Sequence, residues 1–132
     1  MKKFACFSLM VILALTLIGC QGLEKKIVGK YKVNVDTSGM PADKKAMADA
    51  AKSMLSGMTL ELKADKTSEM TMGTNKQAGT WKLTGDEVEI TAGAGKPMKA
   101  KASSDGKSLT PILDAEQEKM FQGVKMTFQK SE

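Results

Sequence analysis

The most reactive side chains in this sequence belong to two cysteines, Cys6 and Cys20, which both lie within its first 20 residues. The sequence contains no His, and all 20 of its basic residues are Lys. It can therefore build neither a Ser-His-Asp triad nor an imidazole base, and it lacks the Arg fork that clamps phosphate at two points. The 15 acidic residues and 11 methionines are the other side chains that could act in catalysis or bind a metal.

Cys20 ends a segment that is typical of an exported protein. Lys2 and Lys3 precede an almost wholly apolar run from 4 to 18, which is shorter than the ~20 residues that a helix needs to span a bilayer. The run ends in Leu-Ile-Gly-Cys at 17–20, which resembles the lipobox of bacterial lipoproteins. This resemblance implies cleavage before Cys20 and acylation of its thiol. A transmembrane anchor and an ordinary secretory signal with an incidental Cys are the alternatives.

Cleavage at this point predicts three segments: a signal peptide (1–19), a lipidated tether (20–26) and a single domain (27–130). The mature chain would keep 113 residues and a net charge of +3. With Cys6 removed and Cys20 acylated, no thiol would remain for a disulfide or a metal.

The predicted location is the bacterial cell envelope, with the protein held to a membrane by its N-terminal lipid. Gln21 follows the lipidated residue; by the same resemblance, the absence of Asp there favours the periplasmic face of the outer membrane in a Gram-negative cell. The six tether residues after Cys20, fully extended, would reach only ~20 Å. We therefore expect Lys25 and Lys26 to lie near anionic headgroups or, alternatively, to be simply solvated.

Alternating apolar and polar residues predict a mainly β fold of about eight short strands with turn signals between them. The expected strands cover 27–36, 58–63, 67–72, 79–83, 88–90, 98–102, 109–113 and 124–129. This arrangement is typical of a small antiparallel meander that closes as a barrel, and a two-sheet sandwich is the main alternative.

One amphipathic helix of about 15 residues is expected after the first strand. Pro41 suits its first turn and Gly57 suits the position just past its end. The helix should cover one end of the barrel or lie across one face. Its apolar stripe is predicted to pack there, and it contains Met40, Met47, Ala51, Met54, Leu55 and Met58.

Several short motifs, in this order and spacing, resemble those of bacterial lipocalin-like lipoproteins. They are the segments 28–31 (VGKY), 60–67 (LELKADKT), 79–86 (GTWKLTGD), 104–110 (SDGKSLT) and 126–128 (MTF). The chain departs from that pattern at Tyr31, where the family usually has Trp, and at Lys66, where it often has Gly. We expect Lys66 to occupy a turn of another type. The resemblance implies a small β-barrel and, by analogy, binding of a small ligand.

A modest apolar pocket beneath the helix is the candidate site. Its predicted lining combines large apolar side chains from six strands: Tyr31, Leu62, Met70, Trp81, Ile90 and Met126. Core packing is the favoured role for the methionines, while Cu(I) coordination by thioethers and a methionine-lined ligand cavity are the alternatives.

Other candidate groups favour non-catalytic roles. Glu87 and Glu89 fall on an outward strand face, where Lys82 is an expected cross-strand partner. Ser103, Ser104 and Lys101 adjoin a turn, and the Gly-rich loop at 93–96 lacks the rest of a phosphate-binding motif.

The sequence therefore predicts a membrane-anchored lipocalin-like lipoprotein that binds a small apolar ligand. The alternative is a structural or protein-interaction lipoprotein with a filled barrel. We expect no enzymatic activity, cofactor or metal. Nucleic acid is also not an expected partner, because the lysines are dispersed and few aromatic residues accompany them.

Overall fold

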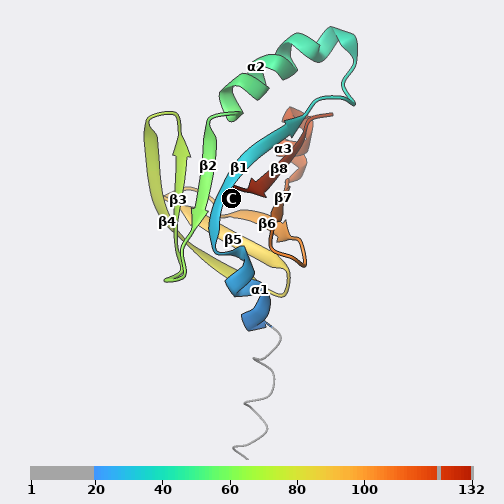
Figure 1. Cartoon of the computed structure of the whole chain (residues 1–132). Helices are drawn as coiled ribbons and strands as arrows, with labels where there is room; N and C mark the ends of the chain where they lie inside the picture. Colours follow the sequence, from blue (N-terminus) through green and yellow to red (C-terminus); the bar gives the residue numbers. More distant parts are fainter. Residues whose placement is uncertain (1–19, 122, 132) are drawn as a thin grey trace, which may run out of the picture.

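The computed structural model describes residues 20–121 and 123–131, so the predicted signal peptide lies outside the described residues. Each strand pairs antiparallel with the next along the chain, and β8 pairs with β1, so the sheet closes into a barrel (Figure 1). The eight strands of the described residues are β1 (Gly29–Asp36), β2 (Met58–Leu62), β3 (Thr67–Met72), β4 (Asn75–Thr84), β5 (Glu87–Ala92), β6 (Met98–Ala102), β7 (Ser108–Ile112) and β8 (Lys125–Lys130). This closure confirms the predicted meander barrel and not the sandwich.

Helices occupy both ends of the barrel. Those within the described residues are α1 (Cys20–Ile27), the 3₁₀-helix η2 (Ala42–Lys44), α2 (Lys45–Leu55) and α3 (Ala115–Met120). The helix expected after the first strand is confirmed as α2, although its α-helical part has 11 residues. Helix α3 begins with a capping box, in which the Asp114 side chain accepts hydrogen bonds from the backbone N–H groups of Glu116 and Gln117.

The segment predicted as an extended tether is instead helical. Helix α1 runs through Ile27, which the alternation had assigned to the first strand, and β1 begins at Gly29. The physical reason is that Ile27 is fully buried against the barrel, so the helix end packs as part of the core. Strand β4 also begins earlier than expected, at Asn75.

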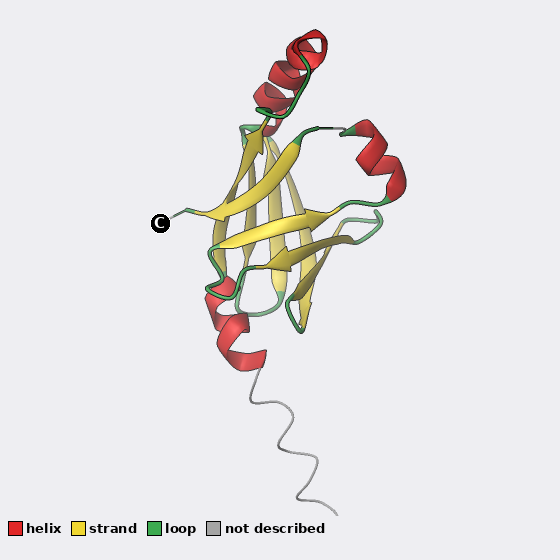
Figure 2. Ribbon diagram, turned by 90° about the vertical axis from the view of Figure 1, so that its right-hand side faces the viewer, coloured by secondary structure: helices red, strands yellow, loops and turns green. Residues whose placement is uncertain are grey.

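The barrel has two different ends (Figures 1 and 2). The α1 end consists of α1 and the turns at 63–66, 85–86 and 103–107, and the α2 end consists of α2, α3 and the turns at 73–74 and 93–97. Helix α2 projects beyond the barrel at its own end (Figure 1). None of the described helices is long and apolar enough to cross a membrane.

The core follows the period-two alternation, because most inward strand residues are apolar, although Ser68 on β3 is a buried polar residue. It fills the α1 end and the middle of the barrel. Its buried members are Ile27, Tyr31, Leu60, Leu62, Trp81, Val88, Ile90, Ala100, Ala102, Leu109 and Phe128.

Candidate functional site

The six predicted pocket residues do not gather beneath α2. Tyr31, Leu62, Trp81 and Ile90 are 0 to 3% exposed and belong to the core, whereas Met70 and Met126 are half-buried. Because Tyr31 and Leu62 are 0% exposed, they border no space that a water molecule could enter. These two residues therefore pack the barrel interior at the α1 end, far along the strands from α2.

Tyr31 supplies the polar group at the centre of the α1 end. Its hydroxyl lies 2.7 Å from the carbonyl oxygen of Ile27 and 2.8 Å from that of Gly106, and its single hydrogen can serve either acceptor. Burial raises the pKa of Tyr31 to about 12, and the negative charge of Asp105 adds to the effect. The phenol thus stays protonated and links α1 to the turn at 103–107.

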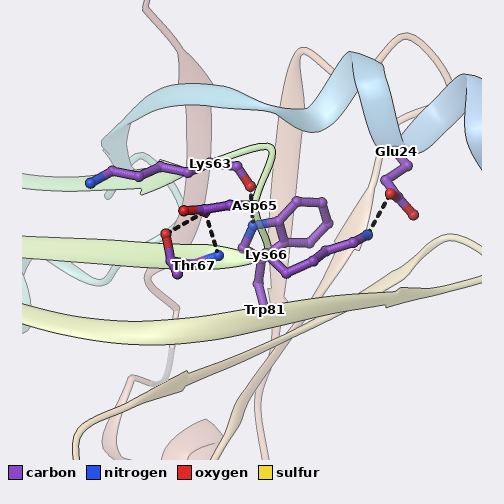
Figure 3. Close-up of polar contacts among 6 residues, drawn as sticks. All are labelled: Glu24, Lys63, Asp65, Lys66, Thr67 and Trp81. Atoms are coloured by element: carbon purple, nitrogen blue, oxygen red, sulfur yellow. Dashed lines mark hydrogen bonds and ion pairs between the residues drawn. The ribbon is translucent and has the colours of Figure 1, made fainter.

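Trp81 and Lys66 form a second link at this end (Figure 3). The indole N–H of Trp81 donates to the carbonyl of Lys63 (2.9 Å), and the Nζ of Lys66 lies 4.3 Å from the Trp81 ring centroid. Lys66 also pairs with Glu24 of α1 at 2.5 Å. This geometry fits a cation–π contact that is joined to an ion pair.

The expectation that Lys66 would occupy a different turn type is wrong. Its φ is 70°, the left-handed value that favours Gly, and it is the one non-Gly residue at positive φ among those described. The backbone N–H of Lys66 donates to the Lys63 carbonyl, and the carbonyl of Lys66 accepts from the backbone N–H of Trp81. The contacts of the lysine side chain with Trp81 and Glu24 accompany this strained backbone and offset its cost.

Helix α1 is fixed to the barrel by backbone as well as side-chain contacts. Leu23 packs against the core beside the buried Ile27, and the Nζ of Lys130 donates to the Lys26 carbonyl at 2.7 Å. Gly106 allows the turn at 103–107 to approach α1 closely, because a Cβ at this position would lie 2.6 Å from the Lys26 carbonyl carbon. The N-terminal segment is therefore a docked helix.

Strands β7 and β8 separate toward the α2 end, and Pro111 explains where their pairing stops. Backbone bonds join Ser103 to Ser108 and Lys130 to Lys107, and because hydrogen-bonding direction alternates along an antiparallel ladder, the odd-numbered positions of β7 face β8. Pro111 is such a position and has no N–H to donate. The β7–β8 pairing ends before it, at Leu109 and Phe128, and α3 bridges the diverging strands (Figure 2).

At this same end, Val35 is buried, but other inward strand positions keep part of their surface exposed. We call five of them the methionine rim: Met58, Met70, Met72, Met98 and Met126. Each shares its strand face with buried residues nearer the α1 end, as Met98 does with Ala100. Met72 is 47% exposed and the other four are half-buried. The rim is an apolar surface that faces the barrel axis and that solvent reaches.

Helix α2 does not pack its whole apolar stripe, and that part of the prediction is wrong. Ala48 is buried at 1% exposure, while Met47 and Met54 are 77% and 76% exposed. The helix contacts β1 at one side, and this contact covers a narrower strip than the stripe. Core packing therefore does not account for these two methionines.

The outward carboxylates have the partners expected of a solvated sheet. Lys82 pairs with Glu89 at 3.0 Å, and Lys99 pairs with Glu87 at 3.0 Å, which confirms their outward, cross-strand interpretation. The Ser103 hydroxyl donates to Asp105 within the predicted turn. Among residues 20–121 and 123–131, no group of three or more His, Cys, Asp or Glu lies close enough to hold a metal ion.

Sequence reasoning overlooked three features of the two ends: the docking of α1, the Lys66–Trp81–Glu24 contact and the interruption at Pro111. Pro111 within a predicted strand was an available signal, because Pro marks an edge or a break in a ladder. The other two features depend on residues that are distant in sequence.

Comparison with known proteins supports the architecture. No protein-family model matches the sequence, and no curated protein sequence is significantly similar to it. The structure is similar to the crystal structure of a DUF4847 family protein from Bacteroides vulgatus, with a TM-score of 0.51 and 15% sequence identity. The match covers 83% of this chain and 98% of that chain. At this identity, the likeness shows a shared small β-barrel fold.

Proposed function

We propose that this protein is a lipid-anchored envelope lipoprotein whose barrel binds a small apolar ligand at the α2 end. The observation that carries the ligand proposal is the contrast between inward positions at the two ends. At the α1 end, inward residues such as Leu62, Val88 and Leu109 are buried, whereas the methionine rim at the α2 end remains accessible. Methionine side chains are flexible and polarizable, so such a rim can adapt to an apolar guest.

The anchoring proposal rests on the Leu-Ile-Gly-Cys tetrad at 17–20 and the Lys-led apolar run before it. Acylation of Cys20 would place the lipid at the N-terminus of α1. Two or more acyl chains on one residue give stable membrane attachment. The proposed location is the cell envelope, on the periplasmic face of the outer membrane if the cell is Gram-negative.

Native mass spectrometry with decanoic acid as the probe tests ligand binding. We expect a one-to-one adduct and a rise in Tm, since a ligand at 100 times its Kd stabilises the folded state by about 2.7 kcal/mol. Met126→Lys should remove both effects by placing a charge on the rim. Met47→Lys, on the exposed face of α2, should retain them. An unmodified mass and an unchanged Tm for the wild-type protein would contradict the proposal.

Metabolic labelling with a palmitate analogue tests the anchor. We expect label on the wild-type protein and none on Cys20→Ala, which should also remain uncleaved or leave the membrane fraction. Unchanged membrane extraction of Cys20→Ala would refute acylation at this residue.

A second candidate function is favoured by α2 itself. Met47 and Met54 expose most of their surface on a helix that projects from the barrel, as a protein-interaction lipoprotein would require. In this case decanoic acid leaves the Tm unchanged, and substitution of Met47 affects a partner's binding. Both candidates are non-catalytic and require neither a cofactor nor a nucleic acid.

A further inference from the structure

The α1 end holds Cys20 close to the barrel. The eight residues of α1 rise only ~12 Å, and contacts along the helix fix it in place. Glu24 pairs with Lys66, the Lys26 carbonyl accepts from Lys130, and Ile27 is buried. The turns at 63–66 and 103–107 both adjoin this helix, through Lys66 and Gly106.

This geometry sets the distance between the barrel and a bilayer. A headgroup layer is about 5–8 Å thick on each side of the hydrocarbon core. Acyl chains on Cys20 would begin at the bottom of that layer. A docked α1 would then place its own last turn, and the two turns beside it, at or just above the headgroups.

Helix α1 and the turns at 63–66, 85–86 and 103–107 carry five lysines and four carboxylates. Lys25 and Lys26 on α1, Lys63 in one turn and Lys107 in the other are all exposed, and we call these four the lysine collar. No ion pair joins any of them to another of the described residues.

Each acidic group at the same end has a partner within the protein. Glu24 and Asp86 are paired with Lys66 and Lys101. Asp65 accepts hydrogen bonds from the backbone N–H and hydroxyl of Thr67. Asp105 likewise accepts from the Ser103 hydroxyl and the Lys107 N–H. All four carboxylates are therefore engaged by neighbouring groups, whereas none of the four collar lysines forms an ion pair with another of the described residues.

We infer that the α1 end rests on an anionic lipid bilayer through the lysine collar and that the methionine rim opens away from the membrane, toward water. This inference rests on the proposed acylation of Cys20. A basic residue at an anionic surface contributes binding equivalent to about a fivefold change in affinity. The docked helix gives the barrel one orientation on the membrane, which a flexible tether could not do.

Lysine footprinting tests this orientation. Lipoprotein purified from membranes is reconstituted in phosphatidylcholine vesicles with or without one quarter phosphatidylglycerol, then acetylated and digested for mass spectrometry. We expect Lys63 and Lys107 to be acetylated about fivefold more slowly on the anionic vesicles at low salt, and equally on both at high salt. Lys45 and Lys96, at the α2 end, should label alike throughout.

The same digest separates the two proposals, because it reports the mass of the Cys20 peptide. With an acylated Cys20, equal labelling of Lys63 on both vesicles, or protection of Lys45 instead, would overturn the orientation while leaving the anchor intact. An unacylated Cys20 would overturn the anchor and, with it, the orientation.

Vesicle sedimentation of a Cys20→Ser chain provides a matched charge control. Lys63→Gln/Lys107→Gln should weaken binding to the anionic vesicles about 25-fold, a factor of five per lysine. Lys45→Gln/Lys96→Gln removes the same charge from the α2 end and should leave binding within about twofold of the parent. Equal losses for the two pairs would mean that net charge attracts the protein without a defined face, contrary to the inference.

Discussion

The two ends of this barrel are built from the same alternating strands but are finished differently. At the α1 end, the inward residues are buried, and a docked helix covers them with hydrogen bonds, an ion pair and a cation–π contact. At the α2 end, Val35 is buried, but five inward methionines stay partly exposed. The β7–β8 ladder stops short there, and α2 contacts the barrel at one side.

This difference shows how a small barrel without disulfides in its described residues can combine stability with an accessible interior. An eight-stranded barrel is just wide enough to be filled by side chains or to hold one small ligand. Here the filling is concentrated in one half. We therefore expect the α1 end to carry most of the folding free energy and the α2 end to tolerate change.

Matched truncations of one inward residue at each end should expose this contrast most strongly. Leu62→Ala should lower the free energy of unfolding by about 2–5 kcal/mol, because its cavity forms inside a fully packed region. Met126→Ala removes a side chain that is half-exposed and should lower it by less than half as much. Urea unfolding of both variants measures the two losses, and equal losses would show that the ends are packed alike.

The docking of α1 can be tested with two glycines that have similar backbone angles. Gly106 and Gly85 have φ values of 70° and 64°, so Ala at either position adds about 1–2 kcal/mol of left-handed strain. Only Gly106→Ala also drives a Cβ into Lys26, whereas nothing lies within 4 Å of a Cβ at Gly85. Gly106→Ala should therefore cost about 1–3 kcal/mol more than Gly85→Ala. Thermal unfolding that finds the two variants equally stable would mean that α1 does not dock against this turn.

Tyr31 should make the α1 end sensitive to alkaline pH. Its folded-state pKa of about 12 lies above the ordinary value of 10.0, so the folded protein holds this proton more tightly than the unfolded chain. The resulting stability is present below about pH 10 and is lost as the pH rises toward 12, by about 2–3 kcal/mol in all. The urea midpoints at pH 9 and pH 11.5 should differ less in Tyr31→Phe than in the wild type. Identical pH dependence in both proteins would mean that the phenol is not buried.

Substitutions of Lys66 should change the free energy of unfolding least, because its backbone strain and its stabilising side-chain contacts oppose each other. Lys66→Ala keeps the left-handed strain but loses the cation–π contact and the exposed ion pair, which together contribute about 1 kcal/mol. Lys66→Gly loses the same contacts but relieves the strain, so its free energy of unfolding should be close to that of the wild type. An Ala variant as stable as the Gly variant would show that the turn does not need a positive φ.

The barrel could be predicted from the sequence, but the structure of its two ends could be predicted only in part. Alternation through residues such as Tyr31, Leu62 and Trp81 identifies the inward faces, and the turn residues between strands identify the meander. The exposure of Met47 could not be predicted in this way, because periodicity defines an apolar stripe but not how much of it packs against a neighbour. The ion pair of Glu24 could not be predicted either, since its partner Lys66 is 42 residues away along the chain.

The most direct test of the central claim uses the methionines themselves as probes. A Cys20→Ser mature chain labelled with ¹³C at the methionine methyl groups is titrated with decanoic acid and followed by NMR. We predict saturable shifts at Met58, Met70, Met98 and Met126 of the rim, with Met47 and Met54 unchanged. Shifts confined to Met47 and Met54, or no saturable shift at any rim methionine, would contradict an apolar binding site at the α2 end.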